Sequence, residues 1–119
     1  MSLIFVYGTL KRGGTNHHNL ADQVLVGAAQ TSAGFCLYNV GTFPGMVRRA
    51  DDRDGVTGEI WDVTAECLAR LDELEDTAHG MYRRETVPLA PPWDQGPVET
   101  YIYLRNVKTL PHIGSNWPV

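Results

Sequence analysis

A chain of 119 residues has room for one hydrophobic core, so we expect a single domain over residues 1–119 that folds without a disulfide or a metal. The net charge is −4 and the ten Lys and Arg residues form no long run, which argues against a nucleic-acid partner and an anionic membrane surface. No segment approaches the roughly 18 apolar residues of a membrane helix. The first residues show no signal-peptide pattern, so we expect a cytoplasmic protein.

The first half of the sequence predicts short strands joined by glycine-containing loops. Residues 3–7 form a continuous apolar run that is typical of a buried central strand. Three glycines in residues 8–16 indicate a shaped loop. Residues 19–26 are either a short helix or irregular, and strands are predicted around residues 33–38 and 45–49.

The second half contains one clear helix. The elements predicted there are a strand over 56–63, a helix over 65–76 with Thr64 as its N-cap, and strands over 82–89 and 98–104. Asp54-Gly55 predicts a hairpin turn, and residues 112–119 show no periodicity, so no structure is assigned to them. Six or seven strands with one good helix indicate an α+β domain built on a barrel-like mixed sheet.

The predicted helix carries one carboxylate on its apolar side. At about 100° per residue, Glu75 projects between Leu68 and Leu71, whereas the neighbouring acids point away. Burial and the negative end of the helix dipole would both raise the pKa of Glu75 toward neutrality, the range that suits a general acid–base. The alternatives are a salt bridge and a helix that ends one turn earlier, leaving Glu75 in water.

The loop after the first strand is the second candidate feature. Small residues directly after a buried strand let backbone N–H groups approach an anionic ligand. Residues 8–15 nearly match a phosphate-binding loop, but Gly14 stands where the lysine is required, so a nucleotide triphosphatase is not expected and a carboxylate is the better anion. The alternative is a tight connection without a ligand. Residues 43–45 are either a pocket wall or a plain turn.

Three ordered blocks of sequence resemble a known family. The first is F-V-Y-G-T-L-K-R-G at residues 5–13, followed by N-H at 16–17. The second comprises G-E-I-W at 58–61, L-D-x-x-E at 71–75 and Y-R at 82–83, and the third is the strand T-Y-I-Y at 100–103. Together they resemble the γ-glutamylcyclotransferase-like superfamily and, within it, the γ-glutamylamine cyclotransferase branch. The likeness spans residues 3 to about 104. The family often has Gly after the motif's Glu, where this sequence has Asp76.

The resemblance implies a fold and a set of site residues. The fold is a small mixed-strand β-barrel with flanking helices. Glu75 would be the catalytic residue that accepts and donates protons. The residues implied to hold the substrate are Tyr7, Gly8, Thr9 and Leu10. Tyr82 is either a further substrate-binding residue or an ordinary strand tyrosine, and Glu59 is expected to face solvent rather than to act as a second buried acid.

The resemblance also implies a reaction. An enzyme of the transferase or lyase type would convert a small-molecule γ-glutamyl amine or amide to 5-oxoproline and a free amine, by attack of the substrate's own α-amine. That chemistry needs no metal and no other cofactor. Two alternatives stay open: a non-catalytic member of the fold that binds a small carboxylate or a protein partner, and a related enzyme that acts on a biosynthetic intermediate. The presence of Glu75 and of the loop over residues 7–10 favours an enzyme.

Overall fold

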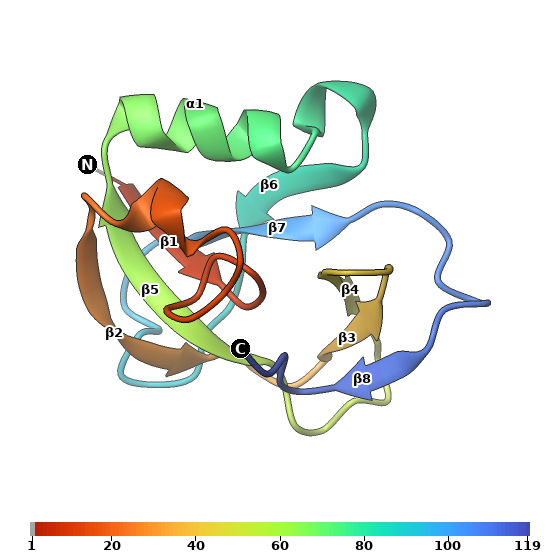
Figure 1. Cartoon of the computed structure of the whole chain (residues 1–119). Coiled ribbons are helices and arrows are strands. Elements are labelled where there is room, and N and C mark those ends of the chain that lie inside the picture. Colours follow the sequence, from red (N-terminus) through yellow and green to blue (C-terminus); the bar gives the residue numbers. More distant parts are fainter. Residues whose placement is uncertain (1) are drawn as a thin grey trace.

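The computed structural model describes residues 2–119 as eight strands, one α-helix and two 3-10 turns (Figure 1). The strands are β1 (Ser2–Val6), β2 (Val24–Gln30), β3 (Phe35–Asn39), β4 (Pro44–Arg48), β5 (Thr57–Val63), β6 (Tyr82–Thr86), β7 (Glu99–Tyr103) and β8 (His112–Gly114). The helix is α1 (Ala65–Leu74), and the 3-10 turns are η1 (His17–Leu20) and η2 (Thr77–His79). Among these residues no helix has the length and the apolar character needed to cross a bilayer.

The strands form a five-stranded sheet in the order β2-β5-β1-β7-β6 and a three-stranded sheet in the order β4-β3-β8. In the larger sheet β1 is antiparallel to β5 and parallel to β7. The α+β class predicted from the sequence is confirmed. Over residues 2–119 the strands make two sheets and do not close into one hydrogen-bonded barrel.

The central strand β1 is buried on both faces because its side chains alternate between two cores. Ile4 and Val6 pack with the buried face of α1, which lies across one side of the larger sheet (Figure 1). Phe5 points to the other side and packs with residues of the smaller sheet, such as Leu37. The continuous apolar run of this strand is therefore the sequence signature of a layer covered on both sides.

Tyrosine hydroxyl groups join the two sheets. The hydroxyl of Tyr7, just after β1, donates to the carbonyl of Tyr101 in β7 at 2.7 Å and accepts from the backbone N–H of Met46 in β4 at 3.2 Å. The hydroxyl of Tyr82 in β6 donates to the carbonyl of Pro44 at 2.8 Å. These bonds tie the edge of β4 to the larger sheet.

Four details differ from the sequence prediction. Strand β2 occupies a segment of which the sequence predicts part to be a short helix or irregular, and β8 lies in the tail, for which the sequence predicts no structure. The hairpin predicted at Asp54-Gly55 is wrong, because the turn joins β4 of one sheet to β5 of the other. Thr64 is the N-cap of α1, as predicted, with its Oγ1 accepting from the N–H of Cys67 at 3.1 Å. The helix ends at Leu74, two residues earlier than expected.

Candidate active site

A pocket of about 230 Å³ opens where the end of α1, the loop after β1 and the start of β4 meet. All six site residues predicted from the sequence lie in its wall: Tyr7, Gly8, Thr9, Leu10, Glu75 and Tyr82. Phe43 and Pro44 line it as well, so the first two residues of the segment 43–45 form a pocket wall rather than only a turn. The fold thus brings together residues from positions 7 to 82 of the chain.

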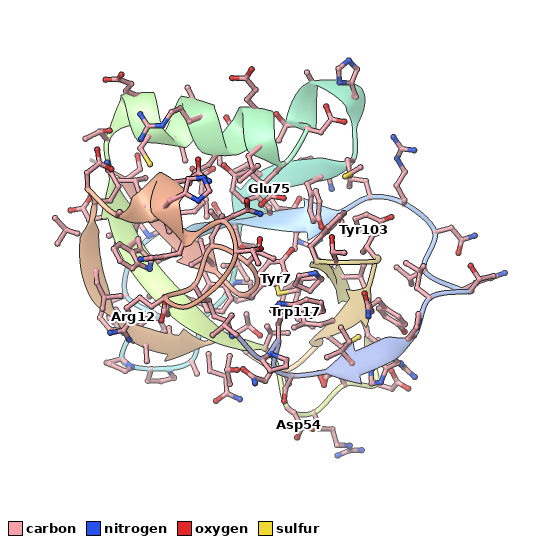
Figure 2. The ribbon with its side chains drawn as sticks, viewed as in Figure 1. Tyr7, Arg12, Asp54, Glu75, Tyr103 and Trp117 are labelled. Atoms are coloured by element: carbon pink, nitrogen blue, oxygen red, sulfur yellow. The ribbon has the colours of Figure 1, made fainter. Side chains whose placement is uncertain are left out.

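Glu75 caps the C-terminal end of α1, with its backbone N–H bonded to the carbonyl of Leu71 at 2.9 Å. Figure 2 shows its side chain beneath the helix end, on the side where Tyr7 lies. Burial alone raises the pKa of Glu75 from its ordinary value of 4.5 to about 7. Among residues 2–119 no group donates a hydrogen bond to this carboxylate or forms a salt bridge with it. The group can therefore be either protonated or ionised near neutral pH.

The backbone conformation of Asp76 ends α1 directly after Glu75. Its backbone has φ 56° and ψ 47°, the left-handed conformation that ends many helices. Gly adopts this conformation without strain, and Asp is among the few other residues that tolerate it. The departure from the family pattern at this position thus leaves the helix end intact. The chain turns away after Glu75, and the carboxylate stays in the pocket wall.

The loop after β1 has an internal framework of backbone bonds. The N–H of Lys11 donates to the carbonyl of Gly8 at 3.1 Å, and the N–H of Asn16 donates to the carbonyl of Thr9 at 2.9 Å. The side chain of Asn16 also donates to Oγ1 of Thr9 at 2.9 Å. In the part of the chain that the structure describes, the N–H groups of Thr9 and Leu10 donate to no acceptor. They are therefore available to an anionic group in the pocket.

Two glycines are required by close contacts in and around this loop. A Cβ atom at Gly8 would lie 2.5 Å from Cγ of Pro44, and one at Gly14 would lie 2.2 Å from the carbonyl oxygen of Thr9. Any larger residue would push the loop away from β4 or open its own turn. Position 14, where a phosphate-binding loop would have its lysine, therefore has to be glycine in this loop.

Glu59 is a functional candidate that the sequence reasoning placed wrongly. The sequence predicts that Glu59 faces solvent, but the residue is only 9% exposed. Its carboxylate accepts from the N–H and Nε of Arg12, both at 3.0 Å, and from Nε1 of Trp61 at 3.2 Å. Burial raises its pKa, but these hydrogen bonds outweigh that effect and hold the pKa below its ordinary value. The sequence feature that could have indicated the burial of Glu59 is Trp61, two residues further along β5 and on the same face. A buried indole N–H needs a hydrogen-bond acceptor, and Glu59 provides one on that face.

Tyr101 is the second residue that the sequence reasoning missed. It lines the pocket from β7 and donates its hydroxyl to Oδ1 of Asp72 at 2.7 Å. Burial and the bond to Asp72 raise its pKa. Burial, with Glu75 nearby, likewise raises the pKa of Tyr7 and of Tyr82. All three phenols are therefore neutral at physiological pH.

In residues 2–119 no group of three or more His, Cys, Asp or Glu side chains is placed to hold a metal ion.

The sequence model of the family described as "Gamma-glutamyl cyclotransferase, AIG2-like" matches residues 4–118. The chain belongs to this family. Among γ-glutamylcyclotransferases it is similar to a putative member from Vibrio cholerae, with 40% identity over 93 residues that cover 76% of this chain and 77% of that protein. It is 33% identical over 107 residues to the γ-glutamylaminecyclotransferase of Bos taurus, covering 84% of this chain and 63% of that protein.

Solved structures of γ-glutamylcyclotransferase-like proteins share the fold. The crystal structure of an AIG2-like protein from Mus musculus superposes with a TM-score of 0.82 at 31% identity, covering 97% of this chain and 87% of the other. The chain spans about half the length of several other curated relatives. The family and these relatives support a γ-glutamylcyclotransferase type of activity.

Proposed function

We propose that the chain converts a γ-glutamyl amine or amide to 5-oxoproline and a free amine, with Glu75 as the acid–base residue. The observation that carries the proposal is the unpaired Glu75 carboxylate in the pocket, whose pKa burial raises to about 7. A group that is half-ionised near neutral pH serves equally well as proton acceptor and proton donor. The relatives named as γ-glutamylcyclotransferases and γ-glutamylaminecyclotransferases support the same chemistry.

The reaction balances with a single carboxylate. The substrate's α-ammonium gives one proton to Glu75, and the amine's lone pair forms a bond to the carbonyl carbon of its own side-chain amide. A five-membered ring and a tetrahedral intermediate result. The carbon–nitrogen bond of the original amide then breaks as Glu75 returns its proton to the departing nitrogen. The ring nitrogen loses its remaining extra proton to the Glu75 carboxylate, which passes it to the released amine, so the amine leaves as an ammonium and Glu75 is ionised again. Because attack is intramolecular, the enzyme contributes mainly by folding the substrate and moving protons.

The loop after β1 would supply the electrostatic part of the proposal. The free N–H groups of Thr9 and Leu10 are suited to hold the substrate's α-carboxylate or the oxygen that becomes negative in the intermediate. The hydroxyls of Tyr7 and Tyr82 already donate to backbone carbonyls. These tyrosines would therefore shape the wall that presses the γ-glutamyl group into a cyclising conformation, rather than exchange protons.

The proposal is tested with one γ-glutamyl amide and its N-acetylated twin. The acetylated compound keeps the scissile amide but has lost the nucleophilic amine, so we expect 5-oxoproline from the first and no cleavage of the second. Chromatography of the products distinguishes the two. Release of glutamate, or equal cleavage of both compounds, would indicate attack by water and would rule out the cyclotransferase.

A further inference from the structure

The proposed reaction needs two groups at a set distance from each other, and these groups come from different elements. Glu75 follows the last turn of α1, whereas the N–H groups of Thr9 and Leu10 lie in the loop after β1. The loop would hold the substrate while Glu75 takes a proton from its amine. A misplacement of about 1 Å can cost about 10²-fold in rate, so the end of α1 has to be fixed relative to the loop.

The last turn of α1 is fixed by Asp72, three residues before Glu75. Oδ1 of Asp72 accepts from the hydroxyl of Tyr101 in β7 at 2.7 Å. The backbone carbonyl of Asp72 accepts from Oγ1 of Thr77, in the turn that follows the helix, at 3.3 Å. Glu75 therefore lies in a short segment that is tied to Asp72 on its far side and, through Asp72, to the larger sheet.

Tyr101 connects this helix end to the loop after β1. Its hydroxyl donates to Asp72, while its backbone carbonyl accepts from the hydroxyl of Tyr7 at 2.7 Å. Tyr7 directly precedes Gly8, the first residue of the loop. Tyr101 is 3% exposed, and its side chain lines the pocket. One buried residue of β7 thus bonds to the helix that carries the base and to the residue from which the loop begins.

Asp72 itself lies outside the pocket, behind Tyr101. It is not among the residues that line the pocket, and its Oδ2 lies 3.5 Å from Nη1 of Arg84 in β6. Both side chains of this ion pair are partly exposed, so the pair should contribute little. The bond from the Tyr101 hydroxyl is short and charge-assisted, and is therefore the stronger of the two. Asp72 is placed to influence the reaction through Tyr101 and the helix end, without touching the substrate.

We propose that Asp72 and Tyr101 are positioning residues that set the distance between Glu75 and the loop after β1. This inference rests on the proposed function and adds the residues that place its base. Tyr101→Phe keeps the ring and the backbone carbonyl and removes only the bond to Asp72. We expect kcat for 5-oxoproline formation to fall roughly ten- to hundredfold. KM should stay within about twofold, because the pocket wall and the loop N–H groups remain.

Variants of Asp72 test whether the hydrogen bond is the cause. Asp72→Ala should lose as much kcat as Tyr101→Phe, whereas Asp72→Asn keeps an oxygen that accepts from Tyr101 and should stay within about threefold of the parent. The double variant of Tyr101→Phe with Asp72→Ala should be no slower than either single variant, since both remove the same bond. Asp22→Ala is the matched control, because Asp22 also forms an ion pair with α1, to Arg70 at 3.9 Å, and is exposed. It should keep the parent kcat.

The assay uses the full chain with γ-glutamyl methylamide, γ-glutamylalanine and glutathione, and compares the variants on the compound that the parent converts fastest. Melting temperatures establish that each variant is folded at the assay temperature. If Asp72→Ala does not fold, Tyr101→Phe against Asp72→Asn decides the matter, because both keep the shape of the side chain.

The outcomes separate the positioning role from the proposed function. Near-parent kcat in Tyr101→Phe, a change in KM alone, or additive losses in the double variant would overturn the positioning role while the cyclotransferase function stands. A loss in Tyr101→Phe with parent-like kcat in Asp72→Ala would also overturn it, since the hydroxyl would then act on the substrate itself. If the parent forms no 5-oxoproline from any of the three compounds, the proposed function fails and the positioning role fails with it.

Discussion

Glu75 differs from the other acids of α1 in its surroundings rather than in its chemistry. Glu73 is exposed on the same helix, and Glu66 lies in its first turn, also exposed. Only Glu75 is turned into the pocket, where burial raises its pKa to about 7. This orientation could be predicted because helical periodicity fixes the direction of a side chain from its position alone. The depth of burial could not, since it depends on the loop and on β4.

Replacing Glu75 by glutamine should remove catalysis and leave the fold intact. Glutamine keeps the shape of the side chain but cannot accept a proton, and general acid–base roles are typically worth ~10²–10⁴-fold in rate. We expect a loss of that size in kcat for 5-oxoproline formation. Glu73→Gln, on the exposed side of the same helix, is the control and should keep its activity. Near-parent turnover by Glu75→Gln would show that another group is the base.

The raised pKa of Glu75 also predicts a dependence of stability on pH. The folded state binds a proton to Glu75 more tightly than the unfolded state does, so its contribution is fully present below pH 4.5 and is lost as the pH rises to about 7. The expected loss is roughly 3 kcal/mol in the free energy of unfolding. Urea unfolding of the parent and of Glu75→Gln at pH 5 and pH 8 isolates this term. An equal change with pH in both proteins would contradict it.

Activity should follow the opposite trend over the same interval. The base must be ionised before it can accept a proton, so kcat/KM should rise with pH with an apparent pKa of about 7. The enzyme would thus gain activity where it loses stability. This opposition is expected when a carboxylate is buried for its chemistry rather than for the fold.

The loop after β1 depends on the neighbouring strand β5 for its position. Glu59 holds both the backbone and the side chain of Arg12, four residues beyond Gly8. The sequence predicted the loop and its glycines, because these are local properties. It did not predict the anchor, because alternation along β5 does not reveal which face another segment covers.

Glu59→Gln should loosen this loop without changing the base. A neutral amide cannot accept from both Arg12 groups with the same strength, and hydrogen bonds to charged groups contribute about 1.5–3 kcal/mol. We expect a higher KM, a lower melting temperature and an unchanged apparent pKa in the pH–rate profile. Glu66→Gln, at an exposed helix position, is the control. A shift of the apparent pKa in Glu59→Gln would mean that Glu59 acts in the chemistry itself.

The last residues of the chain show how the whole molecule supports the pocket. Nζ of Lys11 donates to the carbonyl of Trp117 at 2.6 Å, and the N–H of Thr57 donates to the carbonyl of Ser115 at 2.8 Å. Figure 2 places Trp117 beneath the loop and near Tyr7. Residues 112–119 carry no periodic pattern, so only contacts with distant segments order them. Such contacts cannot be read from local sequence, whereas the α+β class and the central strand could be.

The tyrosine bond to β4 gives the molecule an internal reporter of occupancy. The N–H of Met46 on the outer edge of β4 bonds to the hydroxyl of Tyr7, a pocket residue, so it can exchange with deuterium only when the two sheets separate at this point. A ligand bound between them stabilises the closed state by mass action and should slow that exchange. The Thr57 amide, bonded to Ser115 away from the pocket, is the internal reference. Deuterium uptake at these two amides would therefore detect binding of a non-reactive γ-glutamyl analogue without any turnover. Equal slowing of both would mean that the ligand stabilises the molecule as a whole.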